Sequence, residues 1–297
     1  MDLKSIDAAI ESYKDKASEA DMARLAFFRK IWGAMDEHTI TESSYKKPGA
    51  ATMTAAFHGG MHVFNKTSAQ VEAESFTAAI EAIVAVFCED GSFDEDVTRA
   101  LGRVKWDRIV KASDLSLAGQ RPADYLASCV EILVDDGADE RAARVGALAM
   151  SYALRTQIEA SAAVVAQACE DNNVRSMDQR TCPVCGTAPA LARIGSSEDL
   201  MGRSRRLWCP QCNTSWIYDR IGCARCGCKT QKKLHQHNIE GDEIHRIASC
   251  DQCGGYIRTY IAEGNADLIP FSYEVEDVMS AYLDAIALDP DFKVAGK

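Results

Sequence analysis

Apolar residues recur with the 3.6-residue period of an amphipathic helix through most of the first 170 residues. The clearest stripes are Leu3, Ile6, Ile10 and Tyr13; Leu25, Phe28, Trp32 and Met35; Phe76, Ile80, Ile83, Val84 and Phe87; and Tyr125, Leu126, Cys129, Val130 and Leu133. From Arg141 to Cys169 the chain is rich in alanine and aliphatic residues, which predicts a long helix at the centre of a bundle. Ser92 and Glu95 have the spacing of a capping box that would open a helix through Leu101.

The helical period fades between residues 41 and 65, where glycine is frequent. Connections of this length are uncommon, so we expect either a functional loop or short elements. His58 and His62 lie four positions apart in this stretch. The adjacent Gly59-Gly60 pair and the lack of a third ligand nearby argue against a metal site there.

Short runs of aromatic and β-branched residues replace the helical period after residue 180. Leu207-Trp208 and Thr214–Tyr218 predict the strands of a hairpin. A last helical stripe runs from Val275 to Ile286 and must be buried against the rest of the fold. We therefore expect an α+β protein: an all-helical bundle over residues 1–178, two tandem β-hairpin modules over 179–220 and 221–262, and a C-terminal helix within 263–297 that packs back.

Eight of the twelve cysteines form four C-x2-C knuckles, and the second pair of knuckles repeats the first at an offset of 41 residues. They are Cys182, Cys185, Cys209 and Cys212, then Cys223, Cys226, Cys250 and Cys253. Two thiolates on one tight turn and two on another can converge on one ion, so the spacing predicts two four-cysteine metal sites. The repeat favours sites made of consecutive knuckles and leaves cross-braced pairing open. Sulfur ligands suit both zinc and mononuclear iron.

Other uses of these cysteines fit less well. A thioredoxin-like redox pair needs one knuckle beside a βαβ pattern, and a disulfide framework belongs to secreted proteins. Gly186 and Gly227 follow the first knuckle of each half, where glycine lets the backbone turn tightly and direct N–H groups at sulfur. Cys228 is an extra thiol, and the 41-residue register selects Cys226 in its place. Cys88, Cys129 and Cys169 have apolar helical neighbours and are predicted core residues.

The 297 residues are 47% hydrophobic, enough for a substantial core. The first residues lack a secretory signal, and Arg155 and Glu159 interrupt the apolar stretch from 145 to 169, so we expect a cytoplasmic protein without a membrane span. The net charge of −11 is uneven. Residues 182–258 hold eleven lysines and arginines against seven acidic residues, which leaves −15 on the remainder of the chain.

The knuckles and the helices around them resemble the FdhE family of formate dehydrogenase accessory proteins. The resemblance rests on Cys182-Pro-Val-Cys-Gly186, Cys209-Pro-Gln-Cys-Asn-Thr-Ser-Trp216, Cys223-Ala-Arg-Cys-Gly227 and Cys250-Asp-Gln-Cys-Gly254, in the family's order. It covers about residues 70–290 and is strongest between 180 and 262.

This resemblance implies a cytoplasmic, non-catalytic assembly factor with two rubredoxin-like sites that hold iron rather than zinc. The implied partner is the catalytic subunit of a respiratory formate dehydrogenase, which carries a twin-arginine signal peptide before export. A basic signal peptide would complement the acidic helical portion of the chain.

Two other classes of function compete with this interpretation. A zinc-ribbon nucleic-acid binder would present basic and aromatic residues, here Arg203, Arg205, Arg206, Trp208, Trp216, Lys232 and Lys233. The overall acidity argues against it, and we expect no nucleic-acid partner. A redox enzyme is the second alternative, but four-cysteine sites leave no open coordination position for a substrate, and no dinucleotide-binding loop is present.

Overall fold

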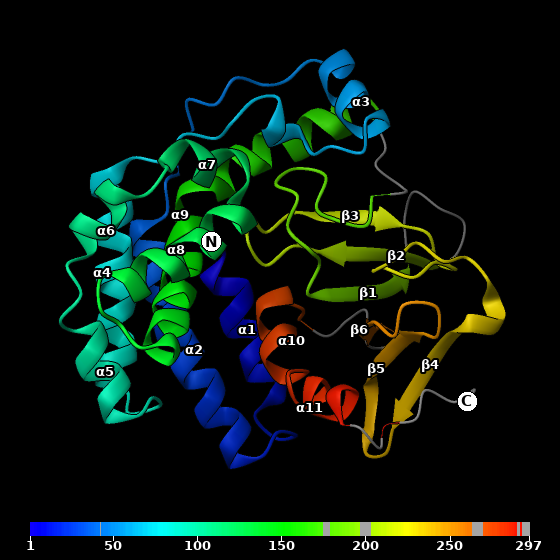
Figure 1. Cartoon of the computed structure of the whole chain (residues 1–297). Helices are drawn as coiled ribbons and strands as arrows, with labels where there is room; N and C mark the ends of the chain where they lie inside the picture. Colours follow the sequence, from blue (N-terminus) through cyan, green and yellow to red (C-terminus); the bar gives the residue numbers. More distant parts are fainter. Residues whose placement is uncertain (42, 175–178, 197–202, 263–269, 290–291, 293–297) are drawn as a thin grey trace.

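The computed structural model describes residues 1–297 except residue 42 and the segments 175–178, 197–202, 263–269, 290–291 and 293–297. A helical region and a six-stranded sheet lie side by side, and two short C-terminal helices lie between them (Figure 1). This is the α+β arrangement that the sequence predicts. None of the described helices is both long enough and apolar enough to cross a bilayer.

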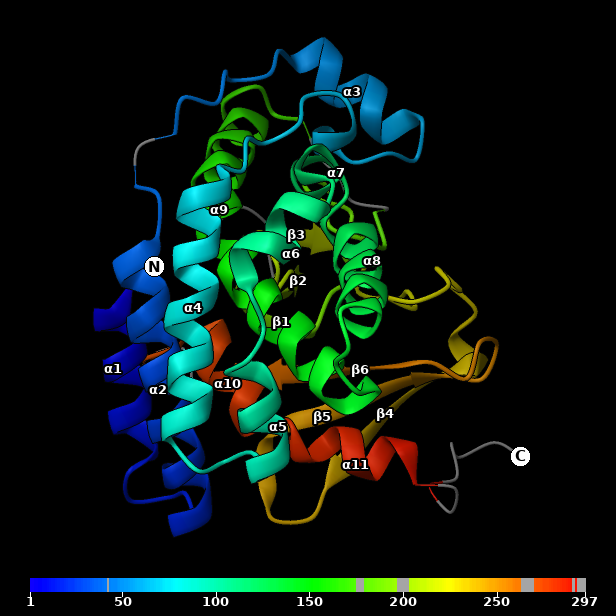
Figure 2. The ribbon, with the colours of Figure 1, turned by 60° about the vertical axis from the view of Figure 1, so that its left-hand side comes forward.

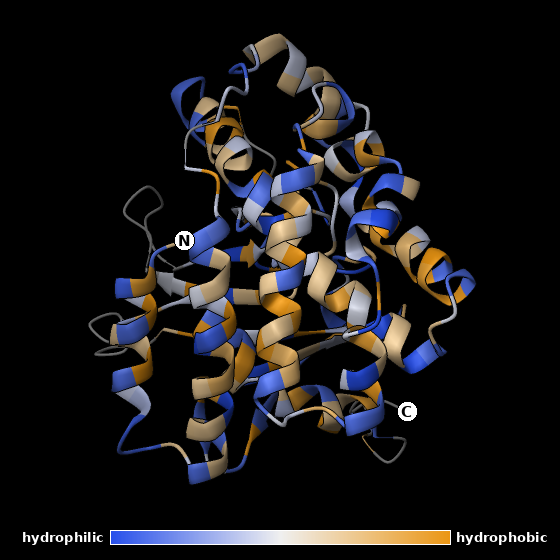
Figure 3. Ribbon diagram, turned by 90° about the vertical axis from the view of Figure 1, so that its left-hand side faces the viewer, coloured by the Kyte–Doolittle hydropathy of each residue, from blue (hydrophilic) through white to orange (hydrophobic). Residues whose placement is uncertain are grey.

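The hydrophobic stripes predicted for the first 170 residues all lie on helices of the first region. The helices of this region are α1 (Leu3–Tyr13), α2 (Glu19–His38), α3 (Ala50–His58), α4 (Ala73–Glu89), α5 (Glu95–Leu101), α6 (Trp106–Ala112), α7 (Leu115–Gln120), α8 (Pro122–Asp135) and α9 (Glu140–Asp171). The 32-residue α9 lies at the centre and packs against α2, α4, α5 and α8 (Figure 2). Hydrophobic and hydrophilic residues alternate around these helices, as expected for a bundle with one solvated side (Figure 3).

Small residues allow the neighbouring helices to approach α9 closely. Ala149 and Ala153 are fully buried. A Cβ atom on Gly146 would lie 3.0 Å from Leu133 Cδ1 and 3.1 Å from Trp106 Cη2. The side chain of Asp139 caps the first turn by accepting hydrogen bonds from two backbone N–H groups, which satisfies donors that the helix itself leaves free. The alanine-rich composition is therefore explained by close packing on several sides.

Three details of the helical prediction were wrong or incomplete. The capping box does not form, because α5 begins at Glu95 after Asp94 and the Ser92 hydroxyl donates to Asp90. The stretch between residues 41 and 65 contains two short elements, α3 and the 3₁₀ turn η1 (Val63–Asn65). Two further short helices, α6 and α7, were not predicted, since six or seven residues show too few periods for a stripe to be recognised.

Six strands form one continuous sheet in the order β3-β2-β1-β6-β5-β4. The strands are β1 (Leu191–Ser196), β2 (Arg203–Trp208), β3 (Ser215–Tyr218), β4 (Leu234–Ile239), β5 (Asp242–Cys250) and β6 (Tyr256–Ile261). The predicted hairpin of β2 and β3 is present, and all neighbouring strands are antiparallel except β1 and β6. This parallel pair joins the two cysteine-rich halves. The predicted module boundary at 220/221 falls between β3 and β4, while residues 178 and 263 lie outside the described segments.

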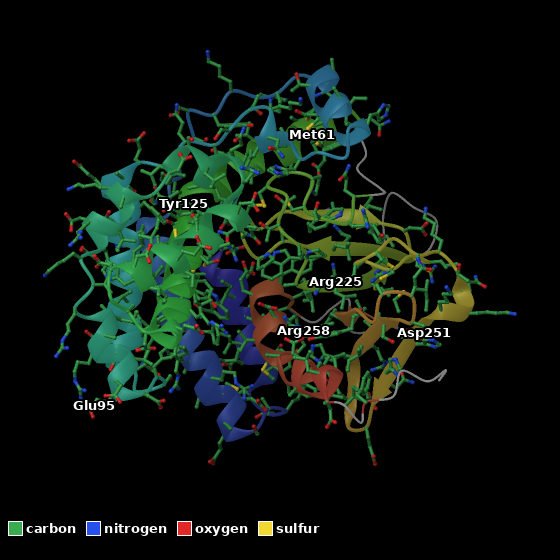
Figure 4. The ribbon with its side chains drawn as sticks, viewed as in Figure 1. Met61, Glu95, Tyr125, Arg225, Asp251 and Arg258 are labelled. Carbon is green, nitrogen blue, oxygen red and sulfur yellow. The ribbon has the colours of Figure 1, made fainter. Side chains whose placement is uncertain are left out.

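The C-terminal helical stripe forms two helices, α10 (Tyr273–Met279) and α11 (Tyr282–Leu288), where a single helix was predicted. The guanidinium of Arg258 on β6 donates to the Asp277 carbonyl at 2.6 Å and also pairs with the Asp277 carboxylate. The buried Ser280 hydroxyl donates to the Glu276 carbonyl. These bonds occupy carbonyl groups at the end of α10, which accounts for the break. Figure 4 shows Arg258 beside both helices.

A buried polar network connects the N-terminal helix, the sheet and α10. The imidazole of His245 on β5 lies 2.7 Å from Asp242 Oδ2 and 2.8 Å from Glu276 Oε2. The Tyr13 hydroxyl on α1 donates to the same Glu276 oxygen at 2.7 Å. Burial opposes a charge on the imidazole, but the two carboxylates outweigh it and raise the pKa of His245 to about 9. A protonated histidine can donate to both carboxylates and offsets one of their two negative charges.

We predict that this network makes stability fall between about pH 6.5 and pH 9. The folded pKa of His245 exceeds its ordinary value of 6.5, so its contribution is fully present below 6.5 and is lost as the pH rises through 9. The shift corresponds to about 3 kcal/mol. Denaturant unfolding of the metal-loaded protein should therefore show His245→Gln far below wild type at pH 6 and closer to it at pH 9.5.

The exposed His58 provides the control, because His58→Gln should leave the stability unchanged at both pH values. A difference between wild type and His245→Gln that stays constant across this pH range would contradict the prediction.

Candidate metal centres

The eight predicted cysteines converge in two groups of four. Within each group the sulfur atoms all lie within 4.8 Å of one another. The first group is Cys182, Cys185, Cys209 and Cys212, and the second is Cys223, Cys226, Cys250 and Cys253. Each cluster combines consecutive knuckles, so the pairing follows the 41-residue repeat and the cross-braced alternative is wrong. We call these the first and second clusters.

All four knuckles have the same backbone hydrogen bonds. In each, the N–H group four residues after the first cysteine donates to the carbonyl of that cysteine, at 2.9 to 3.0 Å. The N–H group of the first cysteine donates to the carbonyl five residues later, at 2.8 to 3.0 Å. In the first knuckle these bonds join Gly186 to Cys182 and Cys182 to Thr187. The turn therefore places both sulfurs of each C-x2-C on one side.

The residue after each second cysteine is in the left-handed backbone region. Gly186, Gly227 and Gly254 have φ values of +82°, +76° and +68°, and Asn213 has +60°. Glycine adopts this conformation without the Cβ clash that other L-residues suffer, and asparagine tolerates it. Asn213 is also held by its side chain, which accepts from Trp208 Nε1 at 2.8 Å and donates to Glu159 at 2.9 Å. Glycine or asparagine therefore follows each knuckle because the backbone at this position is left-handed.

The sulfur geometry fits a tetrahedral ion. Four sulfurs at about 2.3 Å from a metal lie about 3.8 Å from one another. In the second cluster, Cys223 and Cys253 are 3.7 Å apart and Cys226 and Cys250 are 3.8 Å apart. The corresponding pairs in the first cluster are 3.5 Å apart. Both clusters are therefore suited to hold a metal ion, and metal binding by these residues is our proposal.

Electrostatics in the first cluster also favour a cation. Burial and neighbouring sulfurs raise the pKa of Cys182 and Cys209 well above the usual range. Burial opposes ionisation of Cys185 too, but hydrogen bonds from the other three sulfurs lower the pKa of Cys185 well below its usual value. Burial thus opposes the ionisation of several of these sulfurs at once when no cation is present. A divalent cation removes this restriction, because thiolates become the favoured ligands.

The helical region encloses the first cluster. Its four cysteines are at most 2% exposed. On one side Gln211 donates to the Ser151 carbonyl of α9 at 3.0 Å and accepts from the Ser151 hydroxyl at 2.8 Å. On the other side Val63 and Phe64 donate to knuckle carbonyls, each at 2.9 Å. The unassigned stretch before residue 65 is therefore part of the wall of this cluster.

His62 packs against the first knuckle and is not a ligand in either cluster. A Cβ atom on Gly186 would lie 2.4 Å from the His62 ring. The ring lies 3.3 Å from the Val184 carbonyl and 2.7 Å from Asn65 Nδ2. Burial lowers the pKa of His62, which favours the neutral imidazole. A role in packing beside the cluster was not visible in the sequence, because it depends on a contact across more than 120 residues.

The second cluster lies at the outer end of the sheet and is more accessible. Cys250 is buried, Cys226 is partly exposed and Cys253 is exposed. Backbone N–H groups support its sulfurs: those of Arg225 and Cys226 point at Cys223 Sγ at 3.3 and 3.4 Å, and that of Gly255 points at Cys253 Sγ at 3.4 Å. The two clusters thus share one local geometry and differ in their exposure to solvent.

The other four cysteines belong to neither cluster. Cys129 is buried in the core as predicted, whereas Cys88 and Cys169 are only partly buried against it. Burial raises the pKa of Cys129 and Cys169 to about 11 and that of Cys88 above its usual value. Cys228 is 8% exposed, and its carbonyl accepts the Cys223 N–H at 2.9 Å. It occupies the position that Thr187 has in the first half.

The aromatic residues considered for nucleic-acid binding are not available for stacking on bases. Trp208 and Trp216 are 2% and 4% exposed, and Arg205 is buried beneath the same sheet region. Trp208 stacks on Tyr273 of α10 at 5.5 Å, and Trp216 donates to the Gln179 carbonyl at 2.8 Å. The two tryptophans therefore serve the packing of the sheet.

Comparison with known proteins gives consistent results, although no family model matches the chain. An FdhE homolog from Aquifex aeolicus is 32% identical over 111 residues, which cover 37% of this chain and 38% of that protein. FdhE homologs from Shewanella baltica and Actinobacillus pleuropneumoniae are each 28% identical, over 41% and 52% of this chain and 39% and 49% of those proteins. The matched part of the chain spans less than half the length of each relative.

The crystal structure of the FdhE protein from Pseudomonas aeruginosa has a similar fold. The TM-score is 0.58 with 17% sequence identity, over 96% of this chain and 90% of that chain. The similarity therefore extends over the helical region as well as the cysteine-rich sheet.

We predict that each cluster holds one ion independently. Protein purified anaerobically without added metal should contain two ions per chain. Cys185→Ser and Cys253→Ser should each contain one. Because a four-cysteine site supplies on the order of 10 kcal/mol to folding, Cys185→Ser should also unfold the region around the first cluster.

Elemental analysis and thermal melting measure these effects. Cys88→Ser, which changes a thiol outside the clusters, should retain two ions. Unchanged metal content in either cluster variant would contradict the assignment.

We also predict that a chelator removes the two ions at different rates. The second cluster exposes Cys253 to solvent, whereas the first is enclosed, so release should be biphasic with one ion per phase. Absorbance of a chromogenic chelator reports the release, and Cys253→Ser should lack the fast phase. A single phase that releases both ions together would contradict the difference in accessibility.

Proposed function

Because the chain is an FdhE family protein, we propose that it is an accessory protein in the assembly of a respiratory formate dehydrogenase. It binds the catalytic subunit of that enzyme through protein contacts and catalyses no reaction itself. The observation that carries this proposal is the match to FdhE homologs combined with two complete four-cysteine clusters. In each cluster the chain itself supplies all four metal ligands, so no coordination position is left for a substrate.

The proposed place of action is the cytoplasm, before the catalytic subunit is exported. A twin-arginine signal peptide on that subunit would be basic. The helical region and the chain termini together carry −15, whereas residues 182–258 carry +4. Charge complementarity therefore favours the helical region as the contact for such a signal.

Exposed carboxylates lie on the helical region away from the sheet. Asp94, Glu95 and Asp96 at the start of α5 are exposed, and Figure 4 shows Glu95 at the outer side of the bundle. Arg99 and Arg141 pair with these carboxylates. Exposed ion pairs of this kind contribute little to stability, so the carboxylates can exchange partners at little cost.

We propose iron as the metal in both clusters. Sulfur-only ligation accepts iron or zinc, and the FdhE resemblance implies rubredoxin-like sites. The elemental analysis described above should find iron, and the ferric protein should absorb visible light and lose that absorption reversibly on reduction. Stoichiometric zinc in anaerobically prepared protein would contradict iron but would leave the assembly role open.

We predict that the protein co-purifies with a formate dehydrogenase catalytic subunit that retains its signal peptide. Removal of the signal should weaken the association, and the weakening should be greater at low salt, where charge contributes most. The double variant Glu95→Lys/Asp96→Lys should weaken the association in the same way. Affinity pull-down with quantitative blotting measures the bound fraction.

The matched control is Glu240→Lys/Glu243→Lys, which makes the same charge change at two exposed positions, in the turn after β4 and near the start of β5. It should bind as wild type does. Absence of association with either form of the subunit would refute the proposed function. Equal binding of both forms would refute the signal-peptide contact alone.

A further inference from the structure

One face of the sheet carries a pocket of about 280 Å³ beside the second cluster. Five strands contribute to it, together with the segment from Arg220 to Arg225 that leads into the third knuckle. Its strand residues include Arg205 and Ile194, which are directly paired on β2 and β1, Ile257 and Thr259 on β6, Ala248 on β5 and Gln236 on β4. We propose that this pocket binds a small-molecule oxyanion, a carboxylate or a phosphate, through Arg205.

Arg205 is the residue that requires an anion. Its side chain is only 5% exposed, and its Nε atom is buried without a hydrogen-bond partner. Nη1 donates to the Gly222 carbonyl at 2.7 Å, and the guanidinium lies 5.7 Å from the centre of the Tyr218 ring. A guanidinium has five N–H donors, and the Gly222 carbonyl accepts from only one of its nitrogens.

No aspartate or glutamate forms an ion pair with Arg205 among the described residues. Burial lowers the pKa of Arg205, and the more distant Tyr218, Cys223 and Asp219 only partly oppose this effect. An unpaired buried charge is strongly destabilising unless an opposite charge approaches it. A bound oxyanion supplies that charge and matches the guanidinium in shape, because two parallel N–H groups can bond two oxygens.

The other charged residues that line the pocket also favour a bound anion. Arg220 and Arg225 also line it, and both are exposed. Arg225 Nε donates to the Tyr256 carbonyl at 3.0 Å, which holds that side chain at the rim. None of the described residues that line it is acidic, in a chain with 44 acidic residues. Figure 4 places Arg225 in the half of the molecule that holds the sheet.

The size and the walls of the pocket define the ligand further. A volume of 280 Å³ is just below that of pockets for drug-sized molecules, so the ligand is a small metabolite and not a dinucleotide. Ile194, Leu234 and Ile257 provide an apolar part of the wall, and the hydroxyls of Ser249 and Thr259 also line it. A short organic acid or phosphate ester fits this combination of cationic and apolar walls.

The test uses the full chain with both metals bound. Isothermal titration calorimetry with inorganic phosphate, and separately with butyrate, should show saturable binding of one of them at one site per chain. Sodium chloride at equal ionic strength controls for screening. Arg205→Met removes the buried charge with little change in volume and should weaken binding about tenfold or more, the loss expected for a charge-assisted hydrogen bond.

Arg205→Met should melt at or above the wild-type temperature in anion-free buffer, because it removes an unpaired buried charge. The anion should raise the melting temperature of wild type only. Arg144→Met, an exposed arginine on α9, is the matched control and should behave as wild type. If Arg205→Met does not fold, Arg220→Ala and Arg225→Ala at the rim provide the same comparison.

Three results would overturn the proposal. They are the absence of saturable binding of either anion, wild-type affinity in Arg205→Met, and, where that variant does not fold, wild-type affinity in both rim variants. Phosphate binding without butyrate binding, or the reverse, would support the proposal and identify the head group. Because the experiment needs no partner protein, its failure would leave the proposed assembly function untouched.

Discussion

Convergence of four sulfur atoms on one point is the constraint around which the second half of the molecule is built. Thiols packed within 4.8 Å of one another cannot all ionise without a compensating cation, and short strands of four to nine residues have little core of their own. A metal ion removes the electrostatic conflict and links two distant turns at once. The repeated hydrogen bonds of the four knuckles and the left-handed residue after each of them follow from this requirement.

The same local geometry is used in two different environments. The first cluster is enclosed because α9 and the segment before residue 65 bond directly to its knuckles. The second cluster has no such cover over Cys253 and stands beside an arginine-lined pocket. An enclosed site suits a structural ion, which holds the sheet against the helices. An accessible site beside a cationic pocket is suited to exchange with solvent, ligand or partner. The two repeats therefore form sites of the same local geometry that differ in their accessibility to solvent.

The helical and cysteine-rich halves are held together by buried polar groups as well as by apolar packing. Arg155 on α9 pairs with Glu159 and with Glu274 of α10, and it lies 5.7 Å from the Trp208 ring of β2. Tyr13, Glu276 and His245 connect α1, α10 and β5 in the same way. Charged groups with matched partners tolerate burial, whereas an isolated one does not. Among the buried arginines that the structure describes, Arg155 and Arg258 have carboxylate partners and Arg205 forms no ion pair.

The sequence alone determined the helices with long hydrophobic stripes, the eight cysteines and their grouping into two repeats. These features are periodic or fixed in spacing, so they depend on residues close together in the chain. It also contained the signal for the left-handed turns, since glycine follows three of the four knuckles.

Only the tertiary structure decided how the two repeats are joined. The parallel pairing of β1 with β6 brings together strands about 65 residues apart, and no local pattern specifies such a partner. No local pattern specifies the contact of His62 with Gly186 or the hydrogen bond from Arg258 to the last turn of α10. The unequal exposure of the two clusters is likewise a property of the folded chain. Each depends on groups that become neighbours only when the chain folds, because burial and hydrogen-bond partners are properties of the assembled core and not of the residues that enter it.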